Sequence, residues 1–588
     1  MERTDNATVT LTINDIEVTA VKGESVLDAA KRAGIDIPYL CYLNMHDLDV
    51  LNRPASCRVC MVEQVGGSKG KLVPACATFV SNGMVIKTNS KRAINARRTV
   101  VELLLSNHPD DCLTCDRNLT CGLQKLAADL GIKEIRYQGE KAEFEADESS
   151  YSIVRDPSKC VLCRRCEAVC ANVQTVGVLS GINRGFETVV GTAFGTPLTE
   201  TQCTFCGQCA AVCPTGAIVG VDNTKEMWAD LSNPEKYVVV QTAPAVRVAL
   251  GELFGMPAGE VVTGKMVAAL RRLGFDQVLD TNFAADVTVV EESAELIKRI
   301  QKGGQLPMIT TCCPAWIKFI EHQYPQLLAH PSSCKSPQEM MGALTKSYLA
   351  QKLGIDPAKM VCVAIMPCSA KKFEAKREEH QNNGLRNVDY VLSTRELGRM
   401  IKEAGIAFTQ LPDEKFDSFM GESSGAADIF GTTGGVLEAT LRTTYEKLTN
   451  KKLDKLEFEV LRGIEGAVIK EAEIDVDGTK LKVAVAHELR NARKLMDDIL
   501  AGKSEYHAIE IMACPGGCIA GGGQPYHHSS EEVLKKRREG LYKEDKNKTL
   551  RRSHENPEIK QLYEEFLGEP YGDKAHDLLH TEYVERPL

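Results

Sequence analysis

The chain has 588 residues, of which 43% are hydrophobic and 26% are charged, and its formal net charge is −9. This length exceeds one ordinary hydrophobic core and predicts about four domains. The acidic balance excludes the basic surface through which proteins bind nucleic acid. No apolar stretch reaches the roughly 18 residues of a membrane span, and the first residues lack the charged-then-apolar pattern of a secretory signal. We therefore expect a cytoplasmic protein.

The unusual feature of the composition is its 22 cysteines. A reducing cytoplasm disfavours disulfides, and many of these cysteines are separated by gaps of two or three residues, the spacing that metal clusters require. Scattered cysteines that pack as small hydrophobic residues would not show this spacing. The sequence therefore predicts several metal clusters.

The first segment, residues 1–85, is predicted to be a small ferredoxin-like domain. Residues 7–20 alternate as two short strands do, and residues 25–35 have the pattern of an amphipathic helix. Three later loops carry cysteines that can close on one 2Fe-2S cluster, because soft thiolate ligands suit iron. A zinc site is the alternative. The cysteines of this set are Cys41, Cys57, Cys60 and Cys76.

Residues 86–145 contain a histidine that is followed closely by three cysteines. His108 stands four residues before Cys112, and the run continues as C-x2-C-x5-C through Cys115 to Cys121. A lone histidine is more often packed or solvated than metal-bound, but this position favours ligation. The run resembles the 4Fe-4S site, held by one histidine and three cysteines, of the complex I large electron-transfer subunit and of long hydrogenases. The neutral imidazole changes the charge and the reduction potential of such a cluster. An acid-rich stretch at 138–150 is expected to be a linker or an exposed loop.

Residues 146–228 carry a tandem repeat. The pattern C-x2-C-x2-C-x3-C begins at Cys160 and again at Cys203, and the second run is followed by Pro214. The repeat matches two-cluster bacterial ferredoxins, in which the fourth cysteine of each run binds the other cluster. Two 4Fe-4S clusters are therefore expected. One would be held by Cys160, Cys163, Cys166 and Cys213, and the other by Cys203, Cys206, Cys209 and Cys170.

Beyond these modules the hydrophobic pattern of the chain changes. Over residues 229–530, apolar segments alternate with helix-like stretches, which favours an α/β domain. Residues 531–588 are charged, helical in pattern and free of cysteine, and we expect them to wrap the larger domain. The predicted fold class is multidomain α+β: a β-grasp ferredoxin domain, a small helical domain with the histidine-ligated cluster, a two-cluster ferredoxin domain, an α/β catalytic domain and C-terminal wrapping helices.

Three segments of the catalytic half closely resemble the signature sequences of FeFe-hydrogenases. They read ITTCCPAWIKFIE at 309–321, IMPCSAKKFEA at 365–375 and EIMACPGGCIAGGGQPY at 510–526. The N-terminal modules resemble those of long hydrogenases and of the large electron-transfer subunit of complex I. The resemblance implies an H-cluster, a 4Fe-4S cubane joined through a cysteine sulfur to a diiron unit with CO, cyanide and azadithiolate. By position its ligands would be Cys313, Cys368, Cys514 and the bridging Cys518.

The same resemblance implies a proton path. Cys312 would exchange protons with the bridge amine, which suits a thiol because its unperturbed pKa of about 8.5 lies near neutrality. Glu292 and Glu295 would follow, with Ser332 between them. Positions three apart share one face of a helix. A solvated acidic face is the ordinary explanation for such a pair, and the match of ADVTVVEE to the family favours the path.

Other residues are expected around the diiron unit. Lys371 would hold a cyanide by a charge-assisted hydrogen bond. Met366 and Met512 would pack around the bridging CO, although an ordinary core also uses methionine. Ala245 stands where some relatives have a serine near the other cyanide, so this hydrogen bond is lost or passes to the backbone.

The assignments leave three cysteines outside the ligand sets. Cys312 has the proton-relay role above, and Cys362 is expected in the core. For Cys334 the sequence does not separate a functional thiol from a buried one, but its position resembles that of multimeric family members.

The implied reaction is 2H+ + 2e− ⇌ H2, with H2 and protons as substrates. Its cofactors would be one 2Fe-2S cluster, three 4Fe-4S clusters and the H-cluster, whose diiron unit other maturation proteins must build. A non-catalytic electron-transfer subunit of complex I type would lack the three signatures. An iron-sulfur assembly factor related to hydrogenases would lack the N-terminal modules and Cys312.

Within the family, two modes of electron supply remain open. We expect a subunit of an NAD(P)-linked or electron-bifurcating complex with flavin- and NAD(P)-binding partners. The sequence has no GxGxxG dinucleotide fingerprint, so such cofactors would lie on another polypeptide. A monomer that uses ferredoxin is the alternative.

Overall fold

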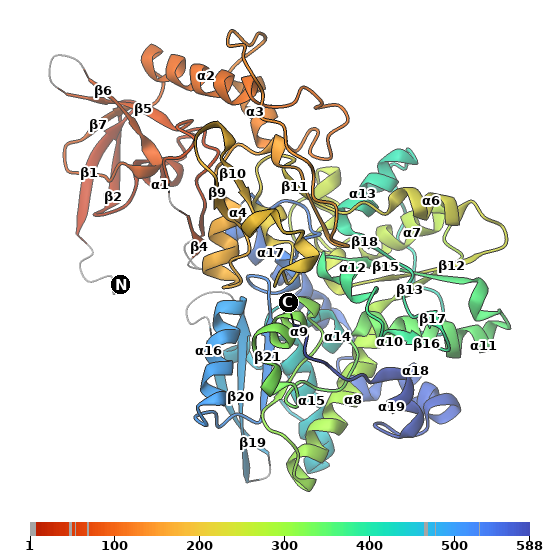
Figure 1. Cartoon of the computed structure of the whole chain (residues 1–588). Helices are drawn as coiled ribbons and strands as arrows, with labels where there is room; N and C mark the ends of the chain where they lie inside the picture. The colour runs from red at the N-terminus through yellow and green to blue at the C-terminus, as the bar shows by residue number, and fades with distance from the viewer. Residues whose placement is uncertain are drawn as a thin grey trace.

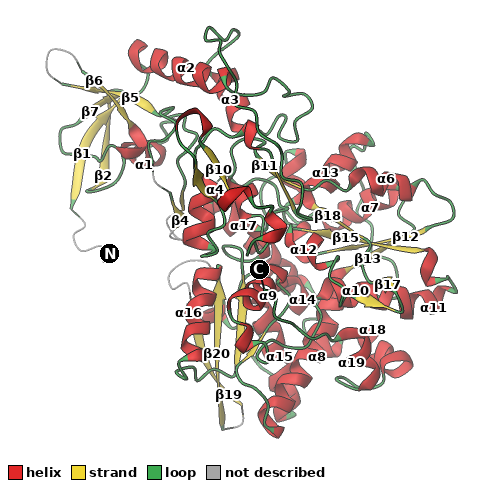
Figure 2. Cartoon of the chain, viewed as in Figure 1, coloured by secondary structure: helices red, strands yellow, loops and turns green. Residues whose placement is uncertain are grey.

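The computed structural model of the chain describes residues 7–45, 50–52, 54–66, 70–463, 469–476, 478–528 and 530–587. Small N-terminal modules, red to yellow in Figure 1, precede a large C-terminal half in green and blue. Helices and strands are mixed through both parts (Figure 2), as predicted. Among the described residues, no helix is long and apolar enough to cross a membrane.

The N-terminal domain is a mixed sheet with a helix packed against it. The two strands predicted within residues 7–20 form an antiparallel hairpin, and the predicted helix is α1 (Val26–Arg32), whose N-cap Ser25 accepts a hydrogen bond from the Asp28 backbone N–H. The sheet order is β2-β1-β7-β5-β6, with β1 and β7 parallel. Its strands are β1 (Thr8–Ile13), β2 (Ile16–Val21), β5 (Met61–Val65), β6 (Lys71–Pro74) and β7 (Val85–Lys87).

A helical segment follows the sheet. Helices α2 (Lys91–Ser106) and α3 (Gly122–Asp129) contact each other, and their buried Val101 and Leu123 share one apolar cluster with Leu40. The acid-rich stretch at 138–150 then forms neither a helix nor a strand, apart from one isolated bridge at Asp147. The prediction of a loop here is confirmed.

The tandem cysteine repeat is also a repeat of backbone conformation. Each run leads into a short helix that begins after a residue in the left-handed region, Arg164 with φ 58° in the first run and Gly207 with φ 71° in the second. Leu162 and Phe205, two residues earlier in each run, also have positive φ. This equivalence supports the internal duplication. The elements are β8 (Ile153–Arg155), α4 (Arg165–Ala168), α5 (Gln208–Val212) and β11 (Ile218–Gly220), with β8 and β11 paired.

The large half contains two sheets. The first is parallel, in the order β13-β12-β15-β18, and its apolar strands are buried as expected for a sheet covered on both faces. The second has the order β14-β21-β20-β19, with only β19 antiparallel to its neighbour. The strands are β12 (Tyr237–Thr242), β13 (Gln277–Asp280), β14 (Met308–Ile309), β15 (Met360–Met366), β18 (Tyr390–Ser393), β19 (Ile469–Val476), β20 (Thr479–His487) and β21 (Ala508–Met512).

A long buried helix, α8, and the C-terminal segment complete this half. Helix α8 packs against α10 and α15, and the C-terminal α18 contacts α8 while α19 contacts α10 (Figure 1). The segment from residue 531 therefore lies against the larger domain, as expected. These helices are α8 (Thr281–Lys302), α10 (Pro337–Leu344), α15 (Gly435–Thr449), α17 (Glu531–Asn547), α18 (Pro557–Leu562) and α19 (Asp573–Leu579).

Candidate active site and metal centres

Four buried thiols meet in the N-terminal domain. Cys41, Cys57, Cys60 and Cys76 are between 1% and 7% exposed, and the Cys41 N–H donates to the Cys57 sulfur at 3.4 Å. Hydrogen bonds from Cys57 and Cys76 lower the pKa of Cys41 to about 2, and a hydrogen bond from Cys76 lowers the pKa of Cys60. The four sulfurs therefore face one another, which fits the donor set of a 2Fe-2S cluster.

His108 has the environment of a ligand histidine. Its Nδ1 lies 3.0 Å from the Pro109 carbonyl oxygen. Its Nε2 is buried and has no hydrogen-bond partner in the described part of the chain. Histidines that bind metal usually donate from one ring nitrogen to a carbonyl or carboxylate and present the other to the metal. Cys112 and Cys115 lie in the loop that follows, and Cys121 is the N-cap of α3.

The tandem repeat forms two separate cavities. One is lined by Cys160, Cys163, Cys166 and Cys213, and the other by Cys170, Cys203, Cys206 and Cys209. Burial raises the pKa of the thiols of each C-x2-C-x2-C run, and the nearby fourth cysteine, Cys213 or Cys170, raises it further. The structure thus brings together the two crossed sets that the ferredoxin pattern predicts.

The catalytic half gathers four further cysteines in one cavity, lined by Cys313, Cys368, Cys514 and Cys518. The first three follow the carboxyl ends of β14, β15 and β21, so strands from both sheets deliver them to one place. Crevices at the carboxyl ends of parallel strands are common binding sites.

The loop before Cys518 requires glycine. Gly517 has a φ of 98°, and a Cβ atom there would lie 2.6 Å from the Thr433 backbone nitrogen. Burial raises the pKa of Cys518 above its usual range, and the nearby Cys368 and Cys313 raise it further. These four close, reduced thiols are the donors that a cubane cluster needs.

The other residues predicted around the cofactor line the same cavity: Cys312, Met366, Lys371, Met512 and Ala245. The Lys371 Nζ donates to the Glu374 carboxylate at 2.7 Å. Burial lowers the pKa of Lys371, but Glu374 more than offsets this effect, so that the pKa is raised overall. A charged ammonium group therefore stands in a buried cavity.

Helix α8 leads from this cavity toward the surface. Its Ala285 and Val289 pack in one apolar cluster with Cys312, and Glu292 lies on the same helical face. Burial raises the pKa of Glu292 to about 8, with further contributions from Glu295 and Glu510. Burial, Cys518 and Cys313 also raise the pKa of Cys312 well above its usual value.

Glu295 and Ser332, the remaining predicted members of the path, are in direct contact. The Ser332 hydroxyl donates to a Glu295 carboxylate oxygen at 2.7 Å. On the side of the cavity, the Thr440 hydroxyl lies 3.5 Å from the Glu292 carboxylate, whose Oε1 is buried and unpaired among the described residues. Both carboxylates are 2% exposed or less.

Two ionisable residues lie beside the carboxylates of Glu292 and Glu295 and were not predicted from the sequence. Arg299 forms an ion pair with Glu295 at 2.6 Å, and its position four residues later on α8 is a signal that helical spacing contains. Glu510 is fully buried and accepts hydrogen bonds from the backbone of Gly434 and Leu437. Burial raises its pKa to about 7. No local pattern marks Glu510, because only the packing of β21 against α15 brings it near Glu292.

Successive cysteine sets also lie next to one another in space. Cys41, Cys57 and Cys163 lie in one apolar cluster, and the Gly122 N–H donates to the Pro214 carbonyl at 2.7 Å. The predicted 2Fe-2S and histidine sites therefore both adjoin the first ferredoxin cavity.

The second ferredoxin cavity adjoins the catalytic one. The Gln208 side chain donates to the Ala520 carbonyl, and the Gln174 side chain donates to the Ala513 carbonyl, both at 2.9 Å. Cys206 also contributes to the raised pKa of Cys514, after burial and the nearer cysteines. The fold and these sets of thiols fit an iron-sulfur protein.

Comparisons with known proteins agree with this class. The chain matches five family models: iron only hydrogenase large subunit, C-terminal domain (236–522); iron hydrogenase small subunit (531–586); NADH-ubiquinone oxidoreductase-G iron-sulfur binding region (97–136); 2Fe-2S iron-sulfur cluster binding domain (6–91); and 4Fe-4S dicluster domain (159–217).

Two curated relatives match nearly the whole chain. It is 54% identical over 584 residues to the NADP-reducing hydrogenase subunit HndD of Solidesulfovibrio fructosivorans, covering 98% of this chain and 99% of the relative. It is 39% identical to iron hydrogenase 1 of Clostridium pasteurianum, covering 98% of this chain and 99% of that relative. A structure of the FeFe-hydrogenase HydA1 from Chlamydomonas reinhardtii has a TM-score of 0.57 and 43% identity, covering 63% of this chain and 100% of that one.

The chain belongs to the FeFe-hydrogenase large-subunit family. It is an enzyme of the hydrogenase class with 2Fe-2S, 4Fe-4S and H-cluster sites, and the predicted family is confirmed.

Proposed function

We propose that the chain is the catalytic subunit of a complex in which flavin- and NAD(P)-binding subunits exchange electrons with H2 and protons. The observation that carries the catalytic role is the cavity between the two sheets, where four cysteines meet Cys312 and Lys371. The 54% identity to a subunit of an NADP-reducing hydrogenase supports the complex. The reaction is 2H+ + 2e− ⇌ H2, and the cytoplasm, where thiols stay reduced, is the proposed location.

The proposed cofactors are one 2Fe-2S cluster, three 4Fe-4S clusters and the H-cluster. When bound, the H-cluster supplies the iron site at which hydrogen is formed or split. Maturation proteins would supply its diiron unit. The proposed ligands are Cys41, Cys57, Cys60 and Cys76; His108, Cys112, Cys115 and Cys121; Cys160, Cys163, Cys166 and Cys213; Cys203, Cys206, Cys209 and Cys170; and Cys313, Cys368, Cys514 and Cys518.

The proposed domain limits follow these cofactors. A β-grasp domain would span 1–85, the histidine-cluster domain 86–145, the two-cluster ferredoxin 146–228 and the catalytic domain 229–530. The wrapping segment would span 531–588. The sheet order β2-β1-β7-β5-β6 and the repeated backbone of the cysteine runs support the first and third of these domains.

Cys312, Glu292 and Glu295 carry protons between the cavity and the surface in this proposal. Cys312 releases a proton toward Glu292 and recovers it in the reverse direction. A carboxyl with a pKa of about 8 is suited to both steps, because its protonated and ionised forms are close in free energy near neutral pH. Ser332 links the two carboxylates, since a hydroxyl accepts one proton while it donates another. Arg299 holds Glu295 in place.

Four other residues shape the cavity. In this proposal the Lys371 ammonium group, which lines the cavity, donates a charge-assisted hydrogen bond to an anionic ligand of the cofactor. Met366 and Met512 are 2% and 1% exposed and fill the cavity wall. Ala245 offers no side-chain donor, so any hydrogen bond at this wall comes from the backbone.

The electron path in this proposal follows the contacts between the modules. The 2Fe-2S and histidine-cluster sites are two separate points of electron supply that converge on the first ferredoxin cavity. The second ferredoxin cavity then adjoins the catalytic cavity. Two supply points suit a chain that receives electrons from more than one partner.

The test begins with the matured chain purified alone. Infrared spectroscopy should detect CO and cyanide bands, and hydrogen turnover should proceed with viologen but without reduction of NAD(P). Capture of the tagged chain from its native host should recover flavoprotein subunits. Recovery of a monomer that turns over rapidly with ferredoxin alone would overturn the complex and support the monomeric alternative.

A further inference from the structure

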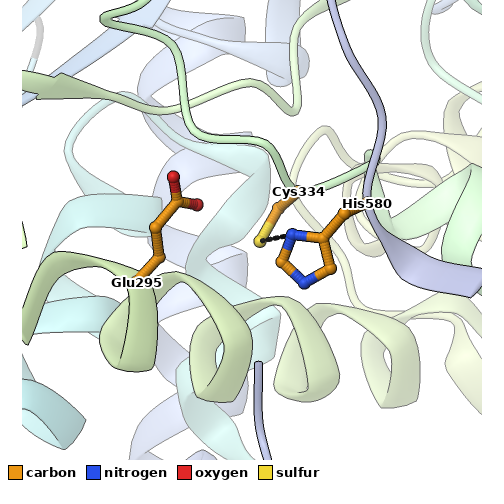
Figure 3. Close-up of side chains that lie close together, drawn as sticks. All are labelled: Glu295, Cys334 and His580. Atoms are coloured by element: carbon orange, nitrogen blue, oxygen red, sulfur yellow. Dashed lines mark hydrogen bonds between the residues drawn. The ribbon is translucent and has the colours of Figure 1, made fainter. Parts of the chain in front are cut away.

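Three potential metal ligands meet at the outer end of the proton path. The ligand atoms of Glu295, Cys334 and His580 all lie within 4.8 Å of one another, and the three residues are at most 5% exposed. Figure 3 shows Glu295 rising from α8 beside Cys334 and the ring of His580, whose Nδ1 is 3.9 Å from the Cys334 sulfur. Neither Cys334 nor His580 has a part in the proposed reaction.

The C-terminal segment delivers His580 to this place through backbone pairing. Cys334 and His580 form an isolated antiparallel bridge. The Thr581 N–H donates to the Ser333 carbonyl at 2.7 Å, and the Lys335 N–H donates to the Leu579 carbonyl at 2.8 Å. Hydrogen bonds on both sides of His580 therefore hold its main chain beside Cys334.

The second nitrogen of His580 has the partner that a metal-binding histidine requires. Its Nε2 lies 3.0 Å from the Glu291 carboxylate, which also accepts hydrogen bonds from the Tyr563 hydroxyl and the Tyr571 N–H. A proton on Nε2 leaves the lone pair of Nδ1 directed toward Ser333 and Cys334. A carboxylate–histidine–metal arrangement of this kind selects the tautomer and raises the basicity of the ligand nitrogen.

The ligand types and the spacing fit zinc. Zn²⁺ binds cysteine, histidine and carboxylate tetrahedrally, at about 2.3 Å to sulfur and about 2.0–2.1 Å to nitrogen, which separates the two atoms by roughly 3.5–3.6 Å. The separation between Cys334 and His580 is only a few tenths of an ångström longer than this value. The Glu295 carboxylate lies beside Cys334, and Glu291 lies beside the His580 ring, so that two carboxylates stand near the position that a divalent cation would take.

We infer that Glu295, Cys334 and His580 form a binding site for Zn²⁺ whose occupation blocks proton transfer. A metal bound to Glu295 takes the carboxylate that Ser332 now contacts, so that the path is interrupted at this residue. The exposed ring of His576 stacks on His580, with centroids 5.0 Å apart, and half-buried Ser333 lies beside it, so the access route from solvent is short. The binding site stands on these contacts, and its inhibitory effect rests on the proposed proton path.

The binding test uses the matured holoenzyme, in which the other cysteine sets hold their clusters. The enzyme is dialysed against Zn²⁺ alone, freed of excess metal and measured by zinc K-edge X-ray absorption. We expect one zinc per chain, with one sulfur at about 2.3 Å and nitrogen and oxygen at about 2.0–2.2 Å. Cys334→Ser should lose the sulfur contribution, whereas Cys362→Ser, which removes another fully buried thiol, should retain it.

Glu291→Gln provides a graded test of the same site. It keeps the size of the side chain but weakens the partner of the His580 ring, and it should lower zinc affinity by about 10- to 100-fold. If His580 only anchored the C-terminal segment to the domain, Glu291→Gln would leave the zinc affinity unchanged. Equal zinc spectra for the wild type, Cys334→Ser and Cys362→Ser would overturn the site.

Inhibition is measured as the ratio of turnover with zinc to turnover without zinc for each variant, so that differences in basal activity cancel. The ratio should fall in the wild type, recover with a chelator and stay near one in Cys334→Ser. If zinc binds with a sulfur ligand but does not lower turnover, the inhibitory effect is rejected and the binding site is retained. Absence of bound zinc would reject the site and leave the hydrogenase assignment untouched.

Discussion

The two ferredoxin cavities and the catalytic cavity each collect four cysteines that are predicted cluster ligands, but they do so in different ways. In the ferredoxin region, three members of each set come from one short run, and left-handed residues such as Arg164 and Gly207 turn the loop around its own cavity. In the catalytic half, Cys313, Cys368 and Cys514 follow strands of two different sheets.

The two ways of collecting cysteines give the electron-transfer region and the catalytic region different structural requirements. The two short runs complete each other's sets without the rest of the chain, and such a module can be joined to many different enzymes. The catalytic cavity instead needs both sheets, and it adds a thiol, an ammonium group and the buried carboxylates of α8. Substitutions in each region test whether the two are independent, and the largest effect is expected at Cys312.

Cys312→Ser should nearly abolish hydrogen turnover without loss of clusters. An alcohol is a far weaker acid than a thiol, so the proton path would be interrupted at its first residue. We expect a loss of more than roughly a hundredfold, the lower end for removal of a general acid–base group. Viologen-linked hydrogen evolution measures the loss, and iron content with infrared bands provides the control. Near-normal evolution by a fully matured variant would contradict the relay role.

Cys213→Ala should damage the cluster held by Cys160, Cys163 and Cys166, although it belongs to the other run of the sequence. Its sulfur lines their cavity and not the cavity of its own run. Iron analysis and EPR should show the loss or conversion of one 4Fe-4S cluster. Cys362→Ala, which removes a buried thiol from β15, is the matched control. An unchanged EPR spectrum in Cys213→Ala would reject the crossed sets.

His108→Ala should change one 4Fe-4S signal and leave the catalytic centre intact. The variant removes the buried Nε2 that has no partner in the described chain, and with it the proposed imidazole ligand. EPR should lose or shift one signal, while the infrared bands of the H-cluster stay unchanged because the cavities are separate. His576→Ala, on an exposed ring of α19, is the control. A cluster spectrum identical to the wild type would show that His108 is not a ligand.

Glu292→Gln should alter the pH dependence of stability by a small amount. Burial raises the pKa of Glu292 to about 8, so the folded state disfavours its ionised form. The resulting penalty is absent below the unfolded-state pKa of about 4.3, grows as the pH rises and is complete above about 8. The variant lacks this penalty, and its Tm relative to the wild type should therefore rise by a few degrees between pH 5 and pH 8.

Differential scanning calorimetry at several pH values measures this trend. Glu187→Gln, at an exposed position, should show no such rise. A Tm difference between Glu292→Gln and the wild type that stays constant with pH would contradict the raised pKa.

The amino-acid sequence by itself determined the features that are local along the chain. The first strands and α1, the loop at 138–150 and the cysteine repeat all depend on neighbouring residues, whose spacing is visible without a structure. The catalytic segments were recognised through their resemblance to a family, since no local spacing joins Cys313 to Cys514.

Only the tertiary structure decided which distant residues meet. It placed the Glu510 carboxylate near Glu292 and set His580 against Cys334 and Glu295. It also brought the 2Fe-2S set against the first ferredoxin cavity. These contacts arise from the packing of sheets, helices and the C-terminal segment, and residues far apart in sequence carry no periodic signal of such packing.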